Sequence, residues 1–193
     1  MPYTKINQII YGFFILFSLA TGIAYSLDDG FGSAKKIESN HFTIYYAPEL
    51  EIATLTQQLN ISPSDEILVG KSSREGNPLA FGLADMLDTL FMRVCDILDM
   101  QLYSFKGNIK ICKDDDYLKA VYKNLFDKNL TRSSFYVNAL NTIYISQESF
   151  QQEILGHEIG HAIISHYFVV SPSVKIQEVL AGYVEYQLRR TGK

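Results

Sequence analysis

The stretch that decides the fold is residues 154–163, Ile-Leu-Gly-His-Glu-Ile-Gly-His-Ala-Ile. It contains two histidines four residues apart, His157 and His161, with Glu158 directly after the first. On an α-helix this spacing is a little over one turn, so both imidazoles project from the same side. Two imidazoles placed in this way suit one tetrahedral zinc ion, and Glu158 then stands where a general base for a water molecule is needed. The stretch therefore predicts a metal-binding helix.

Two glycines interrupt the same helix, at Gly156 and Gly160. Each costs about 1 kcal/mol of helix stability relative to alanine. We expect another backbone or a substrate to approach the helix closely at these positions, because close approach would explain the cost. The alternative is a buried amphipathic helix in which hydrogen bonds satisfy both histidines and no metal binds.

A third protein ligand is expected, because a hydrolytic zinc site usually has three protein ligands and one open position. One known arrangement has a third histidine six residues after the second, but that position is Tyr167 here. His166 lies about 140° around the helix from His161, so we interpret it as a structural or flanking residue. The best candidate is Glu178, which is separated from His161 by sixteen residues and lies in a second apolar segment.

The linker between the two segments favours a helical hairpin. Pro172 is expected to end the first helix, and Ser171 or Ser173 is expected to cap the second. The chain would then turn back and bring Glu178 to face the two histidines.

Small residues on the second helix support close packing of the pair. Ala181 and Gly182 follow Glu178 by three and four residues and share its face, so the two helices are expected to approach closely there. Glu185, two turns further along than Glu178, is the alternative ligand.

Residues 178–185 are Glu-Val-Leu-Ala-Gly-Tyr-Val-Glu. Together with the His-Glu-x-x-His pattern, this segment resembles the motif pair of the gluzincin metallopeptidases, particularly the peptidase-MA-like group, whose second motif typically is Glu-Gly-Leu-Ala-x-Tyr-x-Glu. The resemblance implies His157, His161 and Glu178 as ligands of one zinc ion per chain, with Glu158 as the catalytic base. Val179 stands where that family usually has glycine, and the aromatic residue often found shortly before the Glu is missing.

The resemblance also implies a zincin-like α+β fold, in which a small mixed or antiparallel sheet packs on helices and a Glu-bearing helix follows the active-site helix. In gluzincins the strand beside the active-site helix offers its edge to an extended substrate. Residues 136–145 would take that role here by strand addition, and a plain structural hairpin is the alternative.

Hydrophobic periodicity and turn residues predict the other elements. Residues 28–40 are rich in Gly and charge and are expected to be irregular, and residues 61–78 are the most loop-like part of the chain. Strands are expected at 41–46, 108–112, 134–137 and 142–146, and helices at 49–60, 79–100 and 114–126.

Two local features accompany these elements. Ser149 with Gln152 is expected to form a capping box for the metal-binding helix, with Ser146 as the alternative cap. Cys95 and Cys112 are the only cysteines, and the sequence leaves open whether they form one disulfide or remain two buried thiols.

The N-terminus predicts export. Residues 9–24 are apolar and are followed by small residues suited to signal-peptidase cleavage after Ser26, so residues 1–26 are interpreted as a signal peptide. An uncleaved membrane anchor formed by residues 9–24 is the alternative. Residues 27–193 then make a single domain that is periplasmic or secreted.

The charge balance argues against nucleic acid as a partner. Removing residues 1–26 takes away Lys5 and no acidic residue, so the net charge changes from −4 to −5. Such a chain has no basic stripe to neutralise phosphates.

The pattern as a whole predicts a zinc metallopeptidase that acts on a peptide or protein. Hydrolysis also needs a donor for the oxyanion on the carbonyl oxygen, and the sequence does not choose among four candidates, namely Tyr136, Tyr144, His166 and Tyr183. The alternatives are an exported zinc-binding module without catalysis and a membrane-tethered partner-binding domain. Glu158 favours the enzyme, because a structural zinc site has no use for a base beside the metal.

Overall fold

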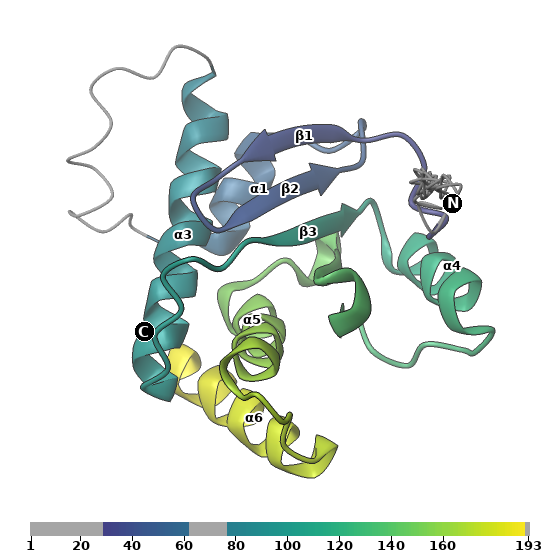
Figure 1. Ribbon diagram of the computed structural model, residues 1–193. Coiled ribbons are helices and arrows are strands. Elements are labelled where there is room, and N and C mark those ends of the chain that lie inside the picture. The colour runs from purple at the N-terminus through teal and green to yellow at the C-terminus, as the bar shows by residue number, and fades with distance from the viewer. Residues whose placement is uncertain (1–28, 62–76, 192–193) are drawn as a thin grey trace, which may run out of the picture.

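The computed structural model describes residues 29–61 and 77–191 and is built around a five-stranded sheet (Figure 1). The strand order is β1-β2-β3-β5-β4. The strands are β1 Lys35–Glu38, β2 Phe42–Tyr46, β3 Gly107–Cys112, β4 Ser134–Val137 and β5 Thr142–Ser146. The three central strands run parallel, and β1 and β4 pair antiparallel at the two edges. The chain is therefore α+β with a mixed sheet, as the sequence predicts.

Most of the helices cover one face of this sheet. The described residues contain five α-helices: α1 Ile52–Leu59, α3 Pro78–Leu98, α4 Asp115–Phe126, α5 Gln152–Tyr167 and α6 Val174–Thr191. Alternate residues of the central strands, such as Ile44, Ile109 and Ile143, point into the main core with α1, α3 and α5. This alternation follows from the two-residue period of a strand, which sends successive side chains to opposite faces.

The opposite face has a smaller core formed by α4 and the segment before β1. Asp29 is buried there against Lys110 of β3 and Tyr144 of β5. The carboxylate of Asp29 accepts hydrogen bonds from the ammonium of Lys110, the hydroxyl of Tyr144 and the backbone N–H of Phe31. These bonds fasten the N-terminal end of the described chain to the sheet.

Helices α5 and α6 form the expected hairpin and lie side by side (Figure 1). Helix α5 ends at Tyr167, before Pro172, and the carbonyl of Ser173 accepts the first backbone hydrogen bonds of α6. The close approach predicted at the glycines of α5 is confirmed. A Cβ added at Gly156 would lie 2.1 Å from Cδ1 of Leu188, and one at Gly160 would lie 3.5 Å from the backbone of Ala181.

Gly182 does not contribute to this contact, and that expectation is wrong. A Cβ added at Gly182 would meet no atom within 4 Å. Ala181, by contrast, is fully buried against α5. Position 182 is turned away because a helix rotates by about 100° between successive residues.

Two other local expectations are corrected, and the open question of the cysteines is answered. β1 forms inside the segment that was expected to be irregular, because the backbone of Lys35–Glu38 pairs with β2 although only one of its side chains is buried. The N-cap of α5 is Gln151 without a side-chain hydrogen bond, and Ser149 belongs to a short 3₁₀ turn that precedes the helix. The capping box is therefore absent. Cys95 and Cys112 are both buried free thiols.

Two sequence predictions lie outside the described residues. These are the signal peptide at residues 1–26, with its alternative of an anchor at 9–24, and nearly all of the loop at 61–78. Within residues 29–61 and 77–191, no helix has the length and apolar character needed to cross a membrane.

Candidate metal centre

Helix α5 presents His157 and His161 together, as their spacing predicts. Their Nε2 atoms lie 3.2 Å apart, and both side chains are mostly buried. The hydrophobic residues on either side of them, including Leu155, Ile159 and Ile163, are fully buried in the main core. The helix is thus fixed by its apolar faces, and its two imidazoles are left at the edge of a hollow.

Helix α6 adds Glu178 to the pair. One carboxylate oxygen lies 3.7 Å from Nε2 of His157, and the other lies 3.7 Å from Nε2 of His161. The three side chains form the one cluster among the described residues in which His, Cys, Asp or Glu atoms could surround a metal ion. Ligands about 2.0–2.1 Å from a tetrahedral zinc ion stand about 3.3 Å from one another. The donor types and spacings therefore fit zinc after a shift of a few tenths of an ångström in Glu178.

The electrostatics of the histidines also suit a metal site. Burial lowers the pKa of His157 and of His161, and it outweighs the opposing charge of Glu178 in each case. The two imidazoles also disfavour a second proton because they stand so close together. A lowered pKa keeps both rings neutral near pH 7, and a metal ion binds only the neutral imidazole.

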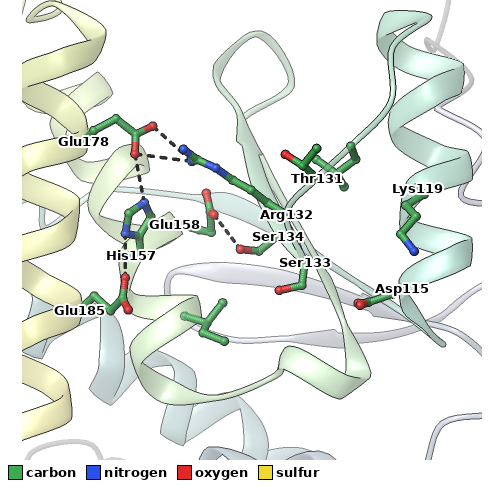
Figure 2. Close-up of a pocket in the computed structure, with 12 residues that line it drawn as sticks. Asp115, Lys119, Thr131, Arg132, Ser133, Ser134, His157, Glu158, Glu178 and Glu185 are labelled. Carbon is green, nitrogen blue, oxygen red and sulfur yellow. Dashed lines mark hydrogen bonds and ion pairs between the residues drawn. The ribbon is translucent and has the colours of Figure 1, made fainter.

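Glu185 stands on the other side of His157. Its Oε2 lies 3.4 Å from Nδ1 of His157 (Figure 2), while Arg189 donates to its Oε1 at 2.6 Å. Glu185 thus faces the ring nitrogen that points away from the cluster. Carboxylates in that position orient metal-binding histidines and fix their tautomer. The geometry therefore favours Glu178 over Glu185 as a ligand.

Glu158 is buried beside the cluster. Only 4% of its surface is exposed, and its Oε1 accepts a hydrogen bond of 2.8 Å from the hydroxyl of Ser134. Burial raises the pKa of Glu158 to about 7, against the opposing effects of Ser134, the charge of Arg132 and the backbone of Tyr136. A carboxyl with a pKa near neutrality can both accept and return a proton at pH 7, which is the requirement for a general base that later acts as an acid.

Two hollows open at these residues. One has a volume of about 620 Å³ and extends from the cluster towards α4, where Asp115 and Lys119 line its far side (Figure 2). The other has a volume of about 330 Å³ and runs towards Tyr136 and the α5–α6 connection. Both are lined by Arg132, Glu158 and Glu178, so the two hollows meet at the cluster.

The four candidate oxyanion donors lie in different places. Tyr144 is buried on the opposite face of the sheet with Asp29, and His166 donates from Nδ1 to the carbonyl of Ala162 at 2.9 Å. Tyr136 lines the smaller hollow, and Tyr183 stands half-exposed on α6. The structure therefore brings Tyr136 near the cluster and leaves the other three elsewhere.

Two residues of the site escaped the sequence analysis, namely Arg132 and Ser134. Arg132 precedes β4 and its Nη1 lies 3.3 Å and 3.5 Å from the two oxygens of Glu178. Ser134 begins β4 and faces Glu158. The only signal for Arg132 was its place just before a predicted strand near the metal-binding helix, and the only signal for Ser134 was its place at the start of that strand.

The chain matches no protein-family model, no curated protein and no solved structure. The function is therefore inferred from the geometry of the site and from the motifs in the sequence.

Proposed function

We propose that this protein is a zinc metallopeptidase of minimal gluzincin type with a zincin-like fold. The observation that carries the proposal is the convergence of His157, His161 and Glu178, whose candidate ligand atoms all lie within 4.8 Å of one another. A structural zinc site would normally be closed by a fourth protein ligand. Here the cluster borders two hollows, and Glu158 stands beside it with a pKa of about 7.

Each residue has a defined part in peptide hydrolysis. His157, His161 and Glu178 would hold one zinc ion, which acts as a Lewis acid and lowers the pKa of water towards neutrality. Glu158 accepts a proton as the water oxygen bonds to the carbonyl carbon, and it gives that proton to the nitrogen of the departing amine. Ser134 holds the carboxylate of Glu158 in place through its hydrogen bond.

The substrate in this proposal is an extended stretch of a peptide or protein. Strand β4 is the last strand of the sheet on the side of α5, and its outer edge has no strand partner among the described residues. An extended peptide could pair with that edge by backbone hydrogen bonds and run through both hollows. The mildly acidic chain gives no reason to propose nucleic acid as a partner. Export by residues 1–26 remains part of the proposal.

The zinc content of the purified protein tests the proposal first. We expect one zinc ion per chain and a marked loss in Glu178→Ala, because the remaining two imidazoles bind the metal weakly. Glu185→Gln should weaken zinc binding by about 10–100-fold, as expected for a residue that orients a ligand. Glu51→Ala, on the exposed start of α1, is the matched control and should bind zinc like the parent.

The result also separates the enzyme from its alternatives. Absence of zinc in the parent after metal is supplied at neutral pH would contradict the metal site and with it the peptidase. Zinc binding without cleavage of any peptide in a mixed library would favour the exported zinc-binding module instead.

A further inference from the structure

Arg132 is a cation in direct contact with the candidate metal centre. It lies in the segment before β4 and extends over Glu158 towards α6, where it pairs with Glu178 (Figure 2). Its charge opposes protonation of His157 and His161 and favours the ionised form of Glu158. The guanidinium is thus within electrostatic range of all four residues of the site.

The pair between Arg132 and Glu178 crosses the place where the two hollows meet. Both residues line the hollow that extends towards α4 and the hollow that runs towards Tyr136. A peptide that passed the cluster from one hollow to the other would therefore pass the guanidinium. Its reacting carbonyl would lie between Arg132 and the side chains of α5.

The ion pair between Arg132 and Glu178 is weak enough for either side chain to take another partner. The side chain of Arg132 is 60% exposed and that of Glu178 is 36% exposed, and the two oxygen distances are long for a charged hydrogen bond. Solvent-exposed ion pairs contribute little to stability. If Glu178 turns its charge towards a metal ion, the guanidinium loses this partner and has N–H donors to offer to another oxygen.

We propose that Arg132 is a catalytic residue that donates hydrogen bonds to the oxyanion formed during hydrolysis. This inference rests on the proposed function. When the water oxygen bonds to the carbonyl carbon, the π electrons of the carbonyl move to its oxygen, and Glu158 takes the water proton. Arg132 stabilises that negative oxygen without transferring a proton. The C–O double bond then re-forms as the C–N bond breaks, and Glu158 gives its proton to the amine.

The other candidate donors are less well placed for this task. Tyr144 lies on the opposite face of the sheet, His166 is bonded to a backbone carbonyl, and Tyr183 lines neither hollow. The hydroxyl of Tyr136 points to the side-chain oxygens of Asn138 and Asn141, at 3.3 Å and 3.2 Å. A guanidinium also carries a full positive charge and can offer two parallel N–H groups, which suits a developing oxyanion.

The test compares Arg132→Ala and Arg132→Lys with the parent in the zinc-loaded full chain. Lys36→Ala is the matched control, because Lys36 is an exposed cation on β1 that lines neither hollow. Three quantities are measured: the affinity for zinc, kcat/KM for a peptide substrate, and the affinity for a peptide phosphinate, whose charged oxygens resemble the oxyanion.

We expect Arg132→Ala to lower kcat/KM by about 10²–10³-fold, as the loss of an oxyanion donor does in other hydrolases. Phosphinate affinity should fall in parallel, zinc affinity should stay within about threefold of the parent, and Arg132→Lys should restore part of both losses because it keeps the charge. Lys36→Ala should match the parent in all three measurements.

Two outcomes would overturn the inference while leaving the proposed function intact. If zinc affinity falls as much as kcat/KM, Arg132 acts only by positioning Glu178. If the parent binds zinc and phosphinate and Arg132→Ala binds the phosphinate equally well, Arg132 does not contact the oxyanion. A parent that binds no zinc overturns the proposed function itself, and the role of Arg132 falls with it.

Discussion

Two buried carboxyl groups stand on opposite faces of the same sheet and differ in what surrounds them. Asp29 is 7% exposed and Glu158 is 4% exposed, so both are shielded from solvent, but Glu158 lies deeper below the protein surface. Burial raises the pKa of Asp29, but hydrogen bonds from Lys110 and Tyr144 outweigh it and the net pKa is lowered. At Glu158 burial prevails, and the pKa is raised to about 7.

The difference in pKa comes from the depth of burial and from the partner that each carboxylate has. The ammonium of Lys110 contacts Asp29 directly, whereas the nearest side-chain donor to Glu158 is the neutral hydroxyl of Ser134. A buried charge with a direct counter-ion is stable and chemically inert, while a buried carboxyl without one is held near its point of titration. The first arrangement fastens the chain to the sheet, and the second suits a general base.

The largest expected effect is on the rate of peptide hydrolysis, which should depend on the carboxyl of Glu158 and not on that of Asp29. Glu158→Gln should lower the rate of peptide hydrolysis by about 10²–10⁴-fold, because an amide cannot accept the proton of water. Zinc content should not change, since Glu158 is not among the three clustered ligands. Activity and zinc per chain measured on the same preparation check this.

Asp29→Asn is the control for that experiment and should keep both zinc and activity. Retained hydrolysis in Glu158→Gln would contradict the assignment of the base. Loss of zinc in that variant would instead indicate that Glu158 supports the metal cluster.

The two groups should also give the zinc-free protein opposite dependences of stability on pH. The raised pKa of Glu158 contributes stability that is fully present below pH 4.5 and is lost as the pH rises through about 7. The lowered pKa of Asp29 contributes stability that is present above pH 3.8 and is lost as the pH falls through its lowered pKa. Between pH 4.5 and 8 the contribution of Glu158 to the free energy of unfolding should fall by on the order of 3 kcal/mol, while the lowered pKa values of His157 and His161 act in the opposite direction.

Urea unfolding of chelator-treated protein at a series of pH values measures this dependence. Glu158→Gln should remove the fall between pH 4.5 and 8. Asp29→Asn should cost about 2–3 kcal/mol at pH 7, because it leaves Lys110 partly buried without a counter-ion. The raised pKa of Glu158 would be contradicted if the difference in stability between the parent and Glu158→Gln does not change from pH 4.5 to 8.

The sequence predicted those parts of the fold that depend on local periodicity. Strands β4 and β5 were predicted with their observed bounds, because alternating aromatic and β-branched residues mark strands wherever they lie. Strand β1 was missed because Lys35–Glu38 has a single apolar residue, and only pairing with β2 makes it a strand. The strand order itself depends on contacts between distant segments.

The same distinction holds within the site. His157, Glu158 and His161 share one helix, so helical geometry alone fixes their relation. Glu178 was found because a short linker can only fold the next helix back. Arg132 and Ser134 reach the cluster through the pairing of β4 with β5 and the packing of α5 on β4, and no sequence spacing reports such contacts.

The smallest expected effect is the change in stability when the hydroxyl that donates to each carboxyl is removed. Ser134 donates to Glu158, and Tyr144 donates to Asp29. A hydrogen bond to a charged group contributes about 1.5–3 kcal/mol, against about 1 kcal/mol for a neutral pair. In the zinc-free protein Glu158 ionises between pH 4.5 and 8, so the cost of Ser134→Ala should grow by about 1 kcal/mol over that range. Asp29 is already ionised there, so the cost of Tyr144→Phe should stay constant.

Unfolding of the parent and of both variants is measured at pH 4.5 and at pH 8. The difference between variant and parent at pH 4.5 is subtracted from that at pH 8, so that effects of each substitution common to both pH values cancel. If the stability cost rises equally in Ser134→Ala and Tyr144→Phe between pH 4.5 and pH 8, both hydroxyls respond to a general change in the protein. Neither would then report on the carboxyl that it contacts. A constant cost for Ser134→Ala would mean that Glu158 keeps one protonation state over the whole range. In that case the contrast between the two carboxyls would lie in their contacts alone, and Glu158 would need bound zinc to bring its pKa into the working range.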